Sequence, residues 1–303
     1  MEGSIRWTLI VPSHNGEDTL SACLSVLHAL RWPEGGHEVI LVDNASTDGT
    51  RALLEQFSHG SGAIVLSEPR KGKSYALNRG IERAAGAMLL FLDDDVIAEP
   101  GLIAAYDEAA REYPEAGVFA GQVRPRWSVG PPEWLAALAD AGRCCGCTPV
   151  GRVPGWLETM HVKGGNMAVR RSALGAHRFA TVGVNFGDGA RATGGEDTDL
   201  ARRLAASGSI RFVSAATVHH LISPREMSWR GVFTRYVRIG RGNAALGLAR
   251  RSALATAGEA VFYAAWAAAA FVLGRRRRAA SEGIKLAMRI GAIDHRLRSS
   301  RMR

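Results

Sequence analysis

The chain has few of the residues that hold small secreted or zinc-bound domains together. It contains four cysteines in 303 residues, and although three lie at 144, 145 and 147, no second pair has zinc-finger spacing. Residues 1–6 lead directly into a short apolar run and lack the hydrophobic segment of a secretory signal. We therefore expect reduced thiols and a cytoplasmic protein.

Most of the chain also lacks net charge. Residues 275–303 contain ten Lys or Arg and two acidic residues, whereas the residues before them contain 28 basic and 27 acidic residues. The overall charge of +9 is therefore a property of the C-terminus. This distribution argues against nucleic acid as a partner and favours a tail that meets an anionic surface, such as the inner face of the cell membrane.

One long apolar segment occurs, at residues 252–273. Its 22 residues include one charged residue, Glu259, and the segment is long enough to cross a bilayer. Ten of these residues are alanine, which favours insertion only weakly, and arginines flank both ends. We expect a helix that lies on a membrane or packs in an oligomer rather than one that spans the bilayer.

The N-terminal part alternates between strand-like and helical patterns. Apolar runs at 7–11, 38–42, 64–66 and 88–92 are separated by segments with helical periodicity. This alternation predicts an α/β fold with a Rossmann-like, mostly parallel sheet flanked by helices. Polar residues follow three of these strands, at 12–15, 43–44 and 93–95. Because ligands bind beyond the carboxyl ends of such strands, we expect these loops to form one site.

Three successive aspartates, Asp93, Asp94 and Asp95, follow the most apolar of the predicted strands. Carboxylates crowded at the end of a buried strand repel one another unless a cation joins them. Oxygen ligands of this kind suit Mg²⁺ or Mn²⁺, and such a metal suits a diphosphate. The alternative is a solvated acidic turn that leads into a helix.

Five segments occur in an order that is similar to a known family. They are residues 11–15 (Val-Pro-Ser-His-Asn), 42–50, 73–80, 92–95 (Leu-Asp-Asp-Asp) and 195–200 (Gly-Glu-Asp-Thr-Asp-Leu). Together they resemble the family 2 glycosyltransferases, inverting enzymes of the GT-A fold. The resemblance implies a catalytic domain at 1–224, with a nucleotide half at 1–122 and an acceptor half at 123–224. Residues 225–303 would form a helical, basic extension that contacts the membrane.

The resemblance also implies residue roles in a transferase that uses an NDP-sugar, an acceptor hydroxyl and Mn²⁺ or Mg²⁺. Asp197 would be the catalytic base and Glu196 would bind the acceptor. Asp95 would bind the metal together with a histidine; strand alternation points only one of His219 and His220 inward, and we expect His219. The residues expected to contact the nucleotide or donor sugar are Pro12, Ser13, Asn15, Asp43, Lys73, Asn78, Arg79, Asp93, Asp94, Gly165 and Asn166.

Each of these residues also has a structural explanation. Asp43 could be a turn residue, Lys73 a solvated cation, and the acids at 196–199 a response to a helix dipole. The Gln-x-x-Arg-Trp motif of processive members is absent, which favours transfer of a single sugar. Two other classes stay open: another NDP-sugar enzyme such as a nucleotidyltransferase, and a non-catalytic, membrane-associated nucleotide-sugar binder.

Overall fold

The computed structural model describes residues 5–181, 193–205, 209–248 and 252–301. The chain divides into two compact units. The first, here called the sheet unit, comprises Met1–Arg126, Gly151–Ala180 and Asp197–Leu221; the second, the helical unit, comprises Trp127–Val150, Thr181–Glu196 and Ile222–Arg303. The predicted boundary at residue 225 lies close to this division, but the predicted acceptor half at 123–224 is shared between both units.

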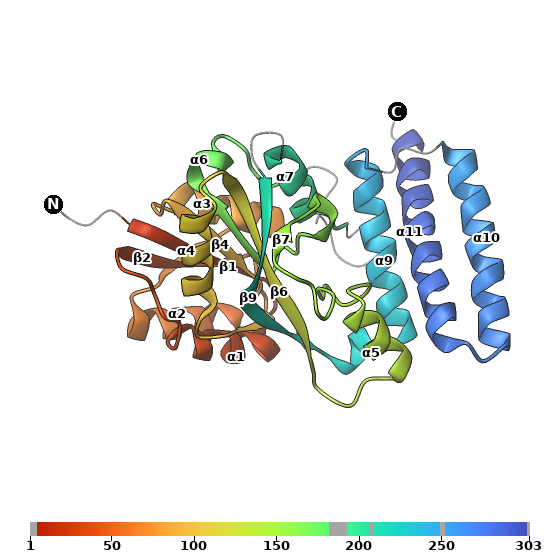
Figure 1. Cartoon of the computed structure of the whole chain (residues 1–303), viewed down its shortest axis with the longest axis horizontal. Helices are drawn as coiled ribbons and strands as arrows, with labels where there is room; N and C mark the ends of the chain where they lie inside the picture. The colour runs from red at the N-terminus through yellow and green to blue at the C-terminus, as the bar shows by residue number, and fades with distance from the viewer. Residues whose placement is uncertain (1–4, 182–192, 206–208, 249–251, 302–303) are drawn as a thin grey trace. The chain divides into compact units, whose positions relative to one another are not determined.

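The strands of the described residues form one sheet in the order β3-β2-β1-β4-β8-β6-β9-β5, with β7 paired to β9 (Figure 1). Their bounds are β1 Ile5–Ser13, β2 Gly36–Asp43, β3 Ile64–Ser67, β4 Met88–Leu92, β5 Val96–Ala98, β6 Ala116–Trp127, β7 Gly155–Trp156, β8 Asn166–Arg170 and β9 Ser209–Ile222. The four strands at the β3 end are parallel, whereas β8 is antiparallel to both β4 and β6, and β9 to both β5 and β7. The sheet is therefore mixed, and only its N-terminal half has the parallel arrangement of a Rossmann-like fold.

Helices cover both faces of the sheet. Successive strand residues point to opposite sides, so apolar strands present an apolar surface on each face. Leu9, Val11 and Leu41 face a core completed by α1 (Glu17–Leu27), α2 (Thr50–Ser61) and α4 (Leu102–Glu112). Ile10 and Val42 face a second core, which includes residues of α3 (Lys73–Arg83), α6 (Arg171–Leu174) and α7 (Glu196–Leu204). All five residues of β4 are buried. The strands are thus apolar on both sides, and their polar residues are left at the strand ends.

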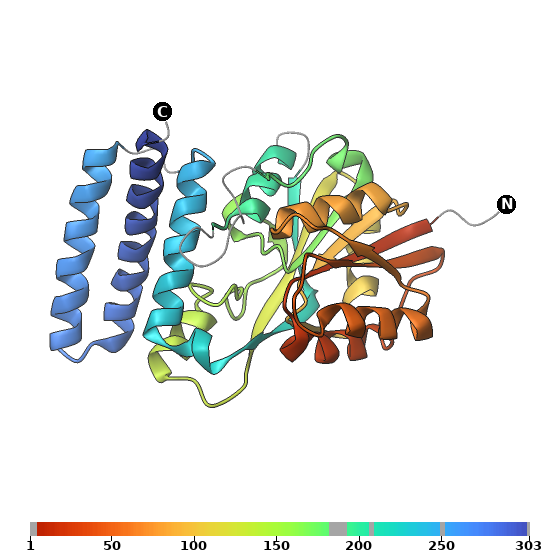
Figure 2. The ribbon, with the colours of Figure 1, turned by 180° about the vertical axis from the view of Figure 1, so that it is seen from behind.

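The helical unit contains α5 (Glu133–Asp140), α8 (Pro224–Met227), α9 (Trp229–Ala245), α10 (Ala253–Val272) and α11 (Arg276–Arg301). A short 3₁₀ helix, η1 (Thr159–His161), belongs to the sheet unit. Figures 1 and 2 show α11 lying between α9 and α10. Serine side chains cap three of these helices: Ser223 accepts a hydrogen bond from Glu226 N, Ser228 from Gly231 N, and Ser252 from Ala255 N.

Helix α10 packs against α11 along one polar stripe. Glu259 forms an ion pair with Arg289 at 2.6 Å, and Arg296 donates to the Thr256 hydroxyl at 3.0 Å. The stretch Leu254–Val272 is long and apolar enough to cross a membrane, by length and composition, yet only 11% of it is buried. The rest of α10 exposes large apolar side chains, among them Val261 and Phe262.

Candidate active site

The three aspartates after β4 point to three different partners. Asp93 forms an ion pair with Lys73, the first residue of α3. Asp94 accepts a hydrogen bond from the hydroxyl of Ser13, which ends β1. Asp95 Oδ2 lies 3.1 Å from Nε2 of His220, on β9. Segments far apart in the sequence are thus joined at the end of one buried strand.

The carboxylates of these aspartates are crowded. Burial, followed by the neighbouring charge of Asp95, raises the pKa of Asp94 to about 7, although the hydrogen bond from Ser13 opposes this shift. Asp93 contributes to the same repulsion, and Lys73 offsets part of it. A site with this much unfavourable negative charge gains stability from a bound cation.

The donor atoms at this place fit Mn²⁺ or Mg²⁺. Carboxylate oxygens with an imidazole nitrogen are ligands that Mn²⁺ accepts, and Mg²⁺ is commonly held by one or two carboxylates and by substrate phosphates. Within the described ranges, no group of three His, Cys, Asp or Glu side chains is preassembled as a complete metal cage. A metal ion beside Asp95 would therefore have few protein ligands in this arrangement and would need further oxygens from solvent or a ligand.

The structure corrects the choice of histidine. His219 Nε2 lies 3.0 Å from Oε1 of Glu99, outside the aspartate cluster, whereas His220 is buried and faces Asp95. The prediction that only one of the two histidines on β9 points inward is correct, but the inward residue is His220 and not His219. Val218 and Ile222, both buried, share the parity of His220 in the strand, whereas Leu221, on the parity of His219, is only partly buried.

Asp197, at the start of α7, lies against a pair of glycines. Its Oδ2 accepts a hydrogen bond from Gly164 N at 2.9 Å, and its Oδ1 accepts one from Thr198 N at 2.7 Å. A Cβ on Gly164 would lie 2.9 Å from Cβ of Asp197, and a Cβ on Gly165 would lie 2.8 Å from Oδ2 of Asp93. Two successive residues without side chains therefore separate Asp197 from Asp93, which brings both carboxylates into one site.

A methyl group at Gly165 is expected to disturb this arrangement. Gly165→Ala would displace the Asp93 carboxylate, and small displacements of a reacting geometry can cost up to roughly 100-fold in rate. We expect kcat/KM for donor turnover to fall by about that factor, while the melting temperature changes little. The matched control is Gly155→Ala, because a Cβ at Gly155 meets no atom within 4 Å. Equal activities of the two variants would contradict the close approach.

The loops after β1 and β2 interlock at the same edge of the sheet. Pro12 and Ser13 pair with Val42 and Asp43 in the parallel register of the two strands. Asp43 is buried, and its Oδ1 accepts a hydrogen bond from Ser46 N at 3.2 Å. These contacts place the predicted nucleotide residues of β1 and β2 side by side.

Asn15 is held in this loop by its backbone and its side chain. It has a φ of 51°, an uncommon conformation that asparagine tolerates better than most residues. Its Oδ1 accepts a hydrogen bond from Thr47 N at 2.8 Å, and its own N–H donates to the Ser46 hydroxyl at 3.1 Å. The Asn15 side chain therefore orders the loop after β2.

Asn44 belongs to this edge, as its place in the 43–44 segment predicts, although the sequence assigned it no separate role. Its Nδ2 donates to the carbonyl oxygens of Glu68 and Arg70, and its Oδ1 accepts a hydrogen bond from Gly72 N at 2.8 Å. Asn44 thus fixes the segment that leads from β3 into Lys73. The sequence signal was its position directly after Asp43, at the end of a strand.

Two residues of α3 that are predicted to lie near the nucleotide have partners within the protein. The side-chain amide of Asn78 donates to Phe179 O and accepts from Phe179 N, both at 2.9 Å, so both of its polar ends are used. Arg79 is exposed and lies 3.5 Å from Glu82 on the same helix. The first residue is a tie between α3 and the segment after α6, and the second is a surface cation.

The side chain of Asn166, a residue predicted to bind the donor, is engaged by the protein itself. Asn166 is fully buried, where its Nδ2 donates to Gln122 O at 3.0 Å and Ala216 O at 2.9 Å. Its Oδ1 accepts a hydrogen bond from the Tyr106 hydroxyl at 2.8 Å. The side chain therefore joins α4, β6, β8 and β9 and has no free edge for a ligand.

Replacing Asn166 can therefore distinguish a role in stability from a role in donor binding. Asn166→Ala would leave the Tyr106 hydroxyl and two carbonyl oxygens without this partner, so we expect the free energy of unfolding to fall by about 3 kcal/mol. Urea unfolding measures this change. The KM of the folded fraction for its donor should stay the same; a raised KM at unchanged stability would restore the donor role.

Glu196, the predicted acceptor residue, belongs to the helical unit and is buried there. Burial lowers the pKa of Arg238 in the same unit, as does the neighbouring Arg235, whereas the charge of Glu196 raises it. Glu196 thus acts as a counter-charge for Arg238. Its contact with an acceptor stays a prediction.

Sequence relatives of the chain are named as glycosyltransferases. The glycosyltransferase AglE of Haloferax volcanii is 36% identical over 90 residues, which cover 29% of this chain and 30% of AglE. WfgD of Escherichia coli, a UDP-Glc:alpha-D-GlcNAc-diphosphoundecaprenol beta-1,3-glucosyltransferase, is 33% identical over 90 residues, 30% of this chain and 35% of WfgD. The matches thus span about a third of the length of these curated relatives.

Solved structures confirm the predicted GT-A type of α/β fold. The mannosyltransferase PcManGT from Pyrobaculum calidifontis, in complex with GDP-Man and Mn²⁺, superposes with a TM-score of 0.65 at 20% identity, over 97% of this chain and 88% of that chain. Residues 1–349 of S. aureus TarS superpose with a TM-score of 0.54 at 14% identity, over 98% and 92% of the two chains. The family model described as "Glycosyl transferase family 2" matches residues 8–177, a span that includes the strand ends, the three aspartates and the glycine pair. The chain therefore belongs to glycosyl transferase family 2.

Proposed function

We propose that the protein is a metal-dependent, inverting glycosyltransferase that moves one sugar from an NDP-sugar to an acceptor hydroxyl. The observation that carries this proposal is the glycine pair at 164 and 165, which holds Asp197 on one side and Asp93 on the other. A sugar placed over this bare backbone would lie between a candidate base and the diphosphate end of the site.

Asp197 is the base in the proposed reaction. Its carboxylate takes the proton of the acceptor hydroxyl while that oxygen bonds to the anomeric carbon from the face opposite the leaving group. The bond from the anomeric carbon to the diphosphate oxygen breaks, and its electron pair leaves with the NDP. The products are an inverted glycoside, NDP and protonated Asp197, which returns its proton to water.

The other residues of the site position the donor. Asp43 accepts a hydrogen bond from the nucleobase of the donor, and Ser13 and Asn15 order the loop beside Asp43. Asp95 and His220 would hold Mn²⁺ or Mg²⁺, which lowers the charge on the departing diphosphate when bound. Asp93 forms an ion pair with Lys73 at the first residue of α3. A phosphate of the donor can replace the Asp93 carboxylate as the partner of the Lys73 ammonium group. PcManGT, which was solved with GDP-Man and Mn²⁺, supports both the donor class and the metal.

The acceptor proposed is a lipid-linked or polysaccharide hydroxyl at the cytoplasmic face of the membrane. The name of WfgD specifies a diphosphoundecaprenol-linked acceptor, which supports this class. The exposed apolar side chains of α10 support a peripheral membrane contact by the helical unit.

A screen of nucleotides and NDP-sugars by thermal shift, with and without Mn²⁺, tests the donor proposal. Ligands that bind only the native state raise its melting temperature. We expect one NDP and its sugar to raise it only with the metal present, and the matching NDP-sugar to be hydrolysed slowly without acceptor. NMR of the transferred sugar then reports inversion at the anomeric carbon. Binding without hydrolysis or transfer would instead indicate a non-catalytic nucleotide-sugar binder.

A further inference from the structure

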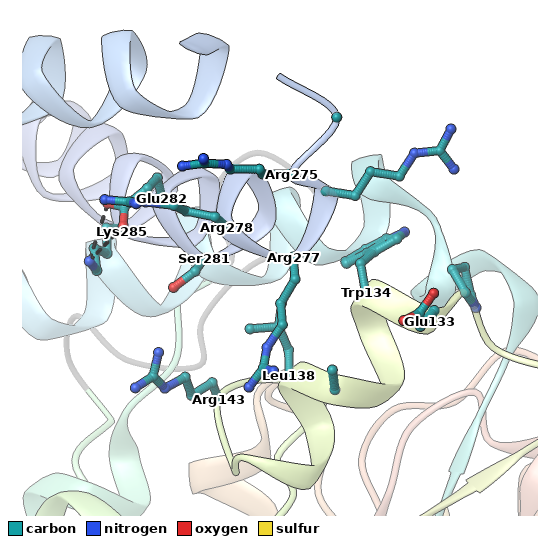
Figure 3. A pocket seen from close by; sticks show the side chains of 14 residues that line it. Glu133, Trp134, Leu138, Arg143, Arg275, Arg277, Arg278, Ser281, Glu282 and Lys285 are labelled. Carbon is teal, nitrogen blue, oxygen red and sulfur yellow. Dashed lines mark hydrogen bonds and ion pairs between the residues drawn. The ribbon is translucent and has the colours of Figure 1, made fainter. Parts of the chain in front are cut away.

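The helical unit contains a cavity of about 860 Å³ between α5 and the start of α11. Six cations line it: Arg143, Lys285 and the four successive arginines at 275–278. The lining also includes two acids, Glu133 and Glu282. In Figure 3 the side chain of Arg277 extends from α11 toward Leu138 on α5, and Arg143 lies in the segment after that helix. The cavity is therefore strongly positive.

Most of this positive charge has no internal counter-charge. Lys285 pairs with Glu282 at 3.1 Å. In the part of the chain that the structure describes, no ion pair joins Arg143, Arg275 or Arg277 to a carboxylate. The site is accessible, because these arginines are exposed. Guanidinium groups gathered in this way can donate paired hydrogen bonds to the oxygens of a phosphate.

The position of the arginines strengthens this argument. Helix α11 begins at Arg276, and its first turn contains no acidic residue. The N-terminal end of a helix carries a partial positive charge, so cations gathered there are unfavourable without an anion. A phosphate in the cavity would interact with both the guanidinium groups and the helix end.

The wall of the cavity is apolar on its α5 side. Trp134 and Leu138 contribute to the lining, and both are buried. Trp134 is held by stacking on Trp229 at a centroid distance of 4.1 Å. A ligand that joins a phosphate to an apolar body would find complementary surfaces here.

An exposed apolar surface leads directly to this cavity. Phe271, Val272 and Leu273, at the end of α10, are 64%, 83% and 66% exposed. They immediately precede Gly274 and Arg275, which line the cavity. Apolar side chains beside unpaired arginines match the boundary between the acyl chains and phosphates of a membrane.

We propose that this cavity binds the phosphate head group of an anionic membrane lipid, with the end of α10 in the adjoining acyl layer. This inference rests on the peripheral membrane contact proposed above and adds a phosphate site to it. A lipid fits better than a soluble phosphate because the apolar end of α10 is continuous in the chain with the arginines.

Vesicle co-sedimentation of the full chain tests the site. The vesicles contain phosphatidylcholine alone or phosphatidylcholine mixed with phosphatidylglycerol. Since each basic residue near an anionic membrane contributes about 1 kcal/mol, Arg143→Gln combined with Arg277→Gln should weaken binding to the mixed vesicles by about 30-fold. The matched control, Arg230→Gln with Arg298→Gln, removes the same charge from exposed positions of α9 and α11 outside the cavity lining. It should change binding by less than about threefold, because neither residue belongs to the lining that would hold the phosphate.

Each other outcome overturns the inference in a distinguishable way. Equal losses in the two double variants would indicate attraction by net charge without a site. Equal binding of the parent chain to both kinds of vesicle would overturn the preference for an anionic lipid but keep the membrane contact. Calorimetric titration with inorganic pyrophosphate that saturates the cavity, without weakening vesicle binding, would assign it to a soluble phosphate. Failure to bind any vesicle, with donor hydrolysis intact, would remove the membrane proposals and leave the transferase proposal standing. Circular dichroism and melting temperature confirm that all variants are folded.

Discussion

Replacing Asp197 by asparagine is expected to lower kcat for sugar transfer by about 1,000-fold while leaving NDP affinity within about twofold, since general bases contribute on the order of 100- to 10,000-fold. Asparagine keeps the size of the side chain and an oxygen that can accept the hydrogen bond from Gly164 N. It cannot take a proton, however, and its amide nitrogen would replace the oxygen that accepts from Thr198 N, so the change removes the base at the cost of one local hydrogen bond. Steady-state kinetics and calorimetric titration with NDP and Mn²⁺ measure the two quantities.

Asp199 provides the matched control on the same helix. Its carboxylate is buried and lies 2.8 Å from Arg203 and 3.5 Å from Arg202. Asp199→Asn should therefore lower the melting temperature, because buried ion pairs are costly to break from one side. The kcat of its folded fraction should stay near that of the parent. If Asp197→Asn lowers NDP affinity as strongly as kcat, Asp197 supports the nucleotide site and is not the base.

Replacing Asp95 by alanine is expected to weaken Mn²⁺-dependent NDP binding by about 100-fold, the upper range for losses around metal sites. The carboxylate at 95 is the one held beside His220, at the end of the most buried strand. Titration with NDP in Mn²⁺, and again in a chelator, separates metal-dependent from metal-independent affinity. The variant with Mn²⁺ should resemble the parent in chelator. A parent that binds NDP equally well in both conditions would contradict the metal role.

The two adjacent histidines allow a sharper comparison. His220→Ala should reduce the same metal-dependent affinity by about 10-fold or more, because it removes the imidazole beside Asp95. His219→Ala removes a side chain of the same type from a surface contact with Glu99, and surface ion pairs are worth little. It should therefore bind NDP like the parent. Equal losses in the two variants would point to a damaged β9 strand and away from a metal ligand.

The sequence predicts the parts of this protein that local patterns encode. Strands β1 to β4 were recognisable as apolar runs, since each is covered on both faces by helices. The polar residues after them necessarily meet at one edge of a parallel sheet, so the cluster of Asp43, Ser13 and the three aspartates was predictable. The pairing of Asp95 with His220 in place of His219 was not encoded in this way, because Leu221 on the parity of His219 is as apolar as Ile222.

Other residues could not be assigned from the sequence, because their partners are distant. Asn78 and Asn166 looked like ligand-binding amides next to family motifs, yet they bond to residues 101 and 60 positions away along the chain. The antiparallel half of the sheet and the cavity beside α11 also depend on long-range packing. Local periodicity carries no information on such pairings.

The two glycines at 164 and 165 have a consequence for inhibitors of this site. Any side chain there would collide with Asp197 or Asp93, so substitutions at these positions would damage the residues that the proposed reaction needs. A substrate mimic that rests on the peptide groups of this pair would therefore meet a surface that is difficult to alter by mutation. Resistance to such a compound would have to arise at positions farther from its point of attachment.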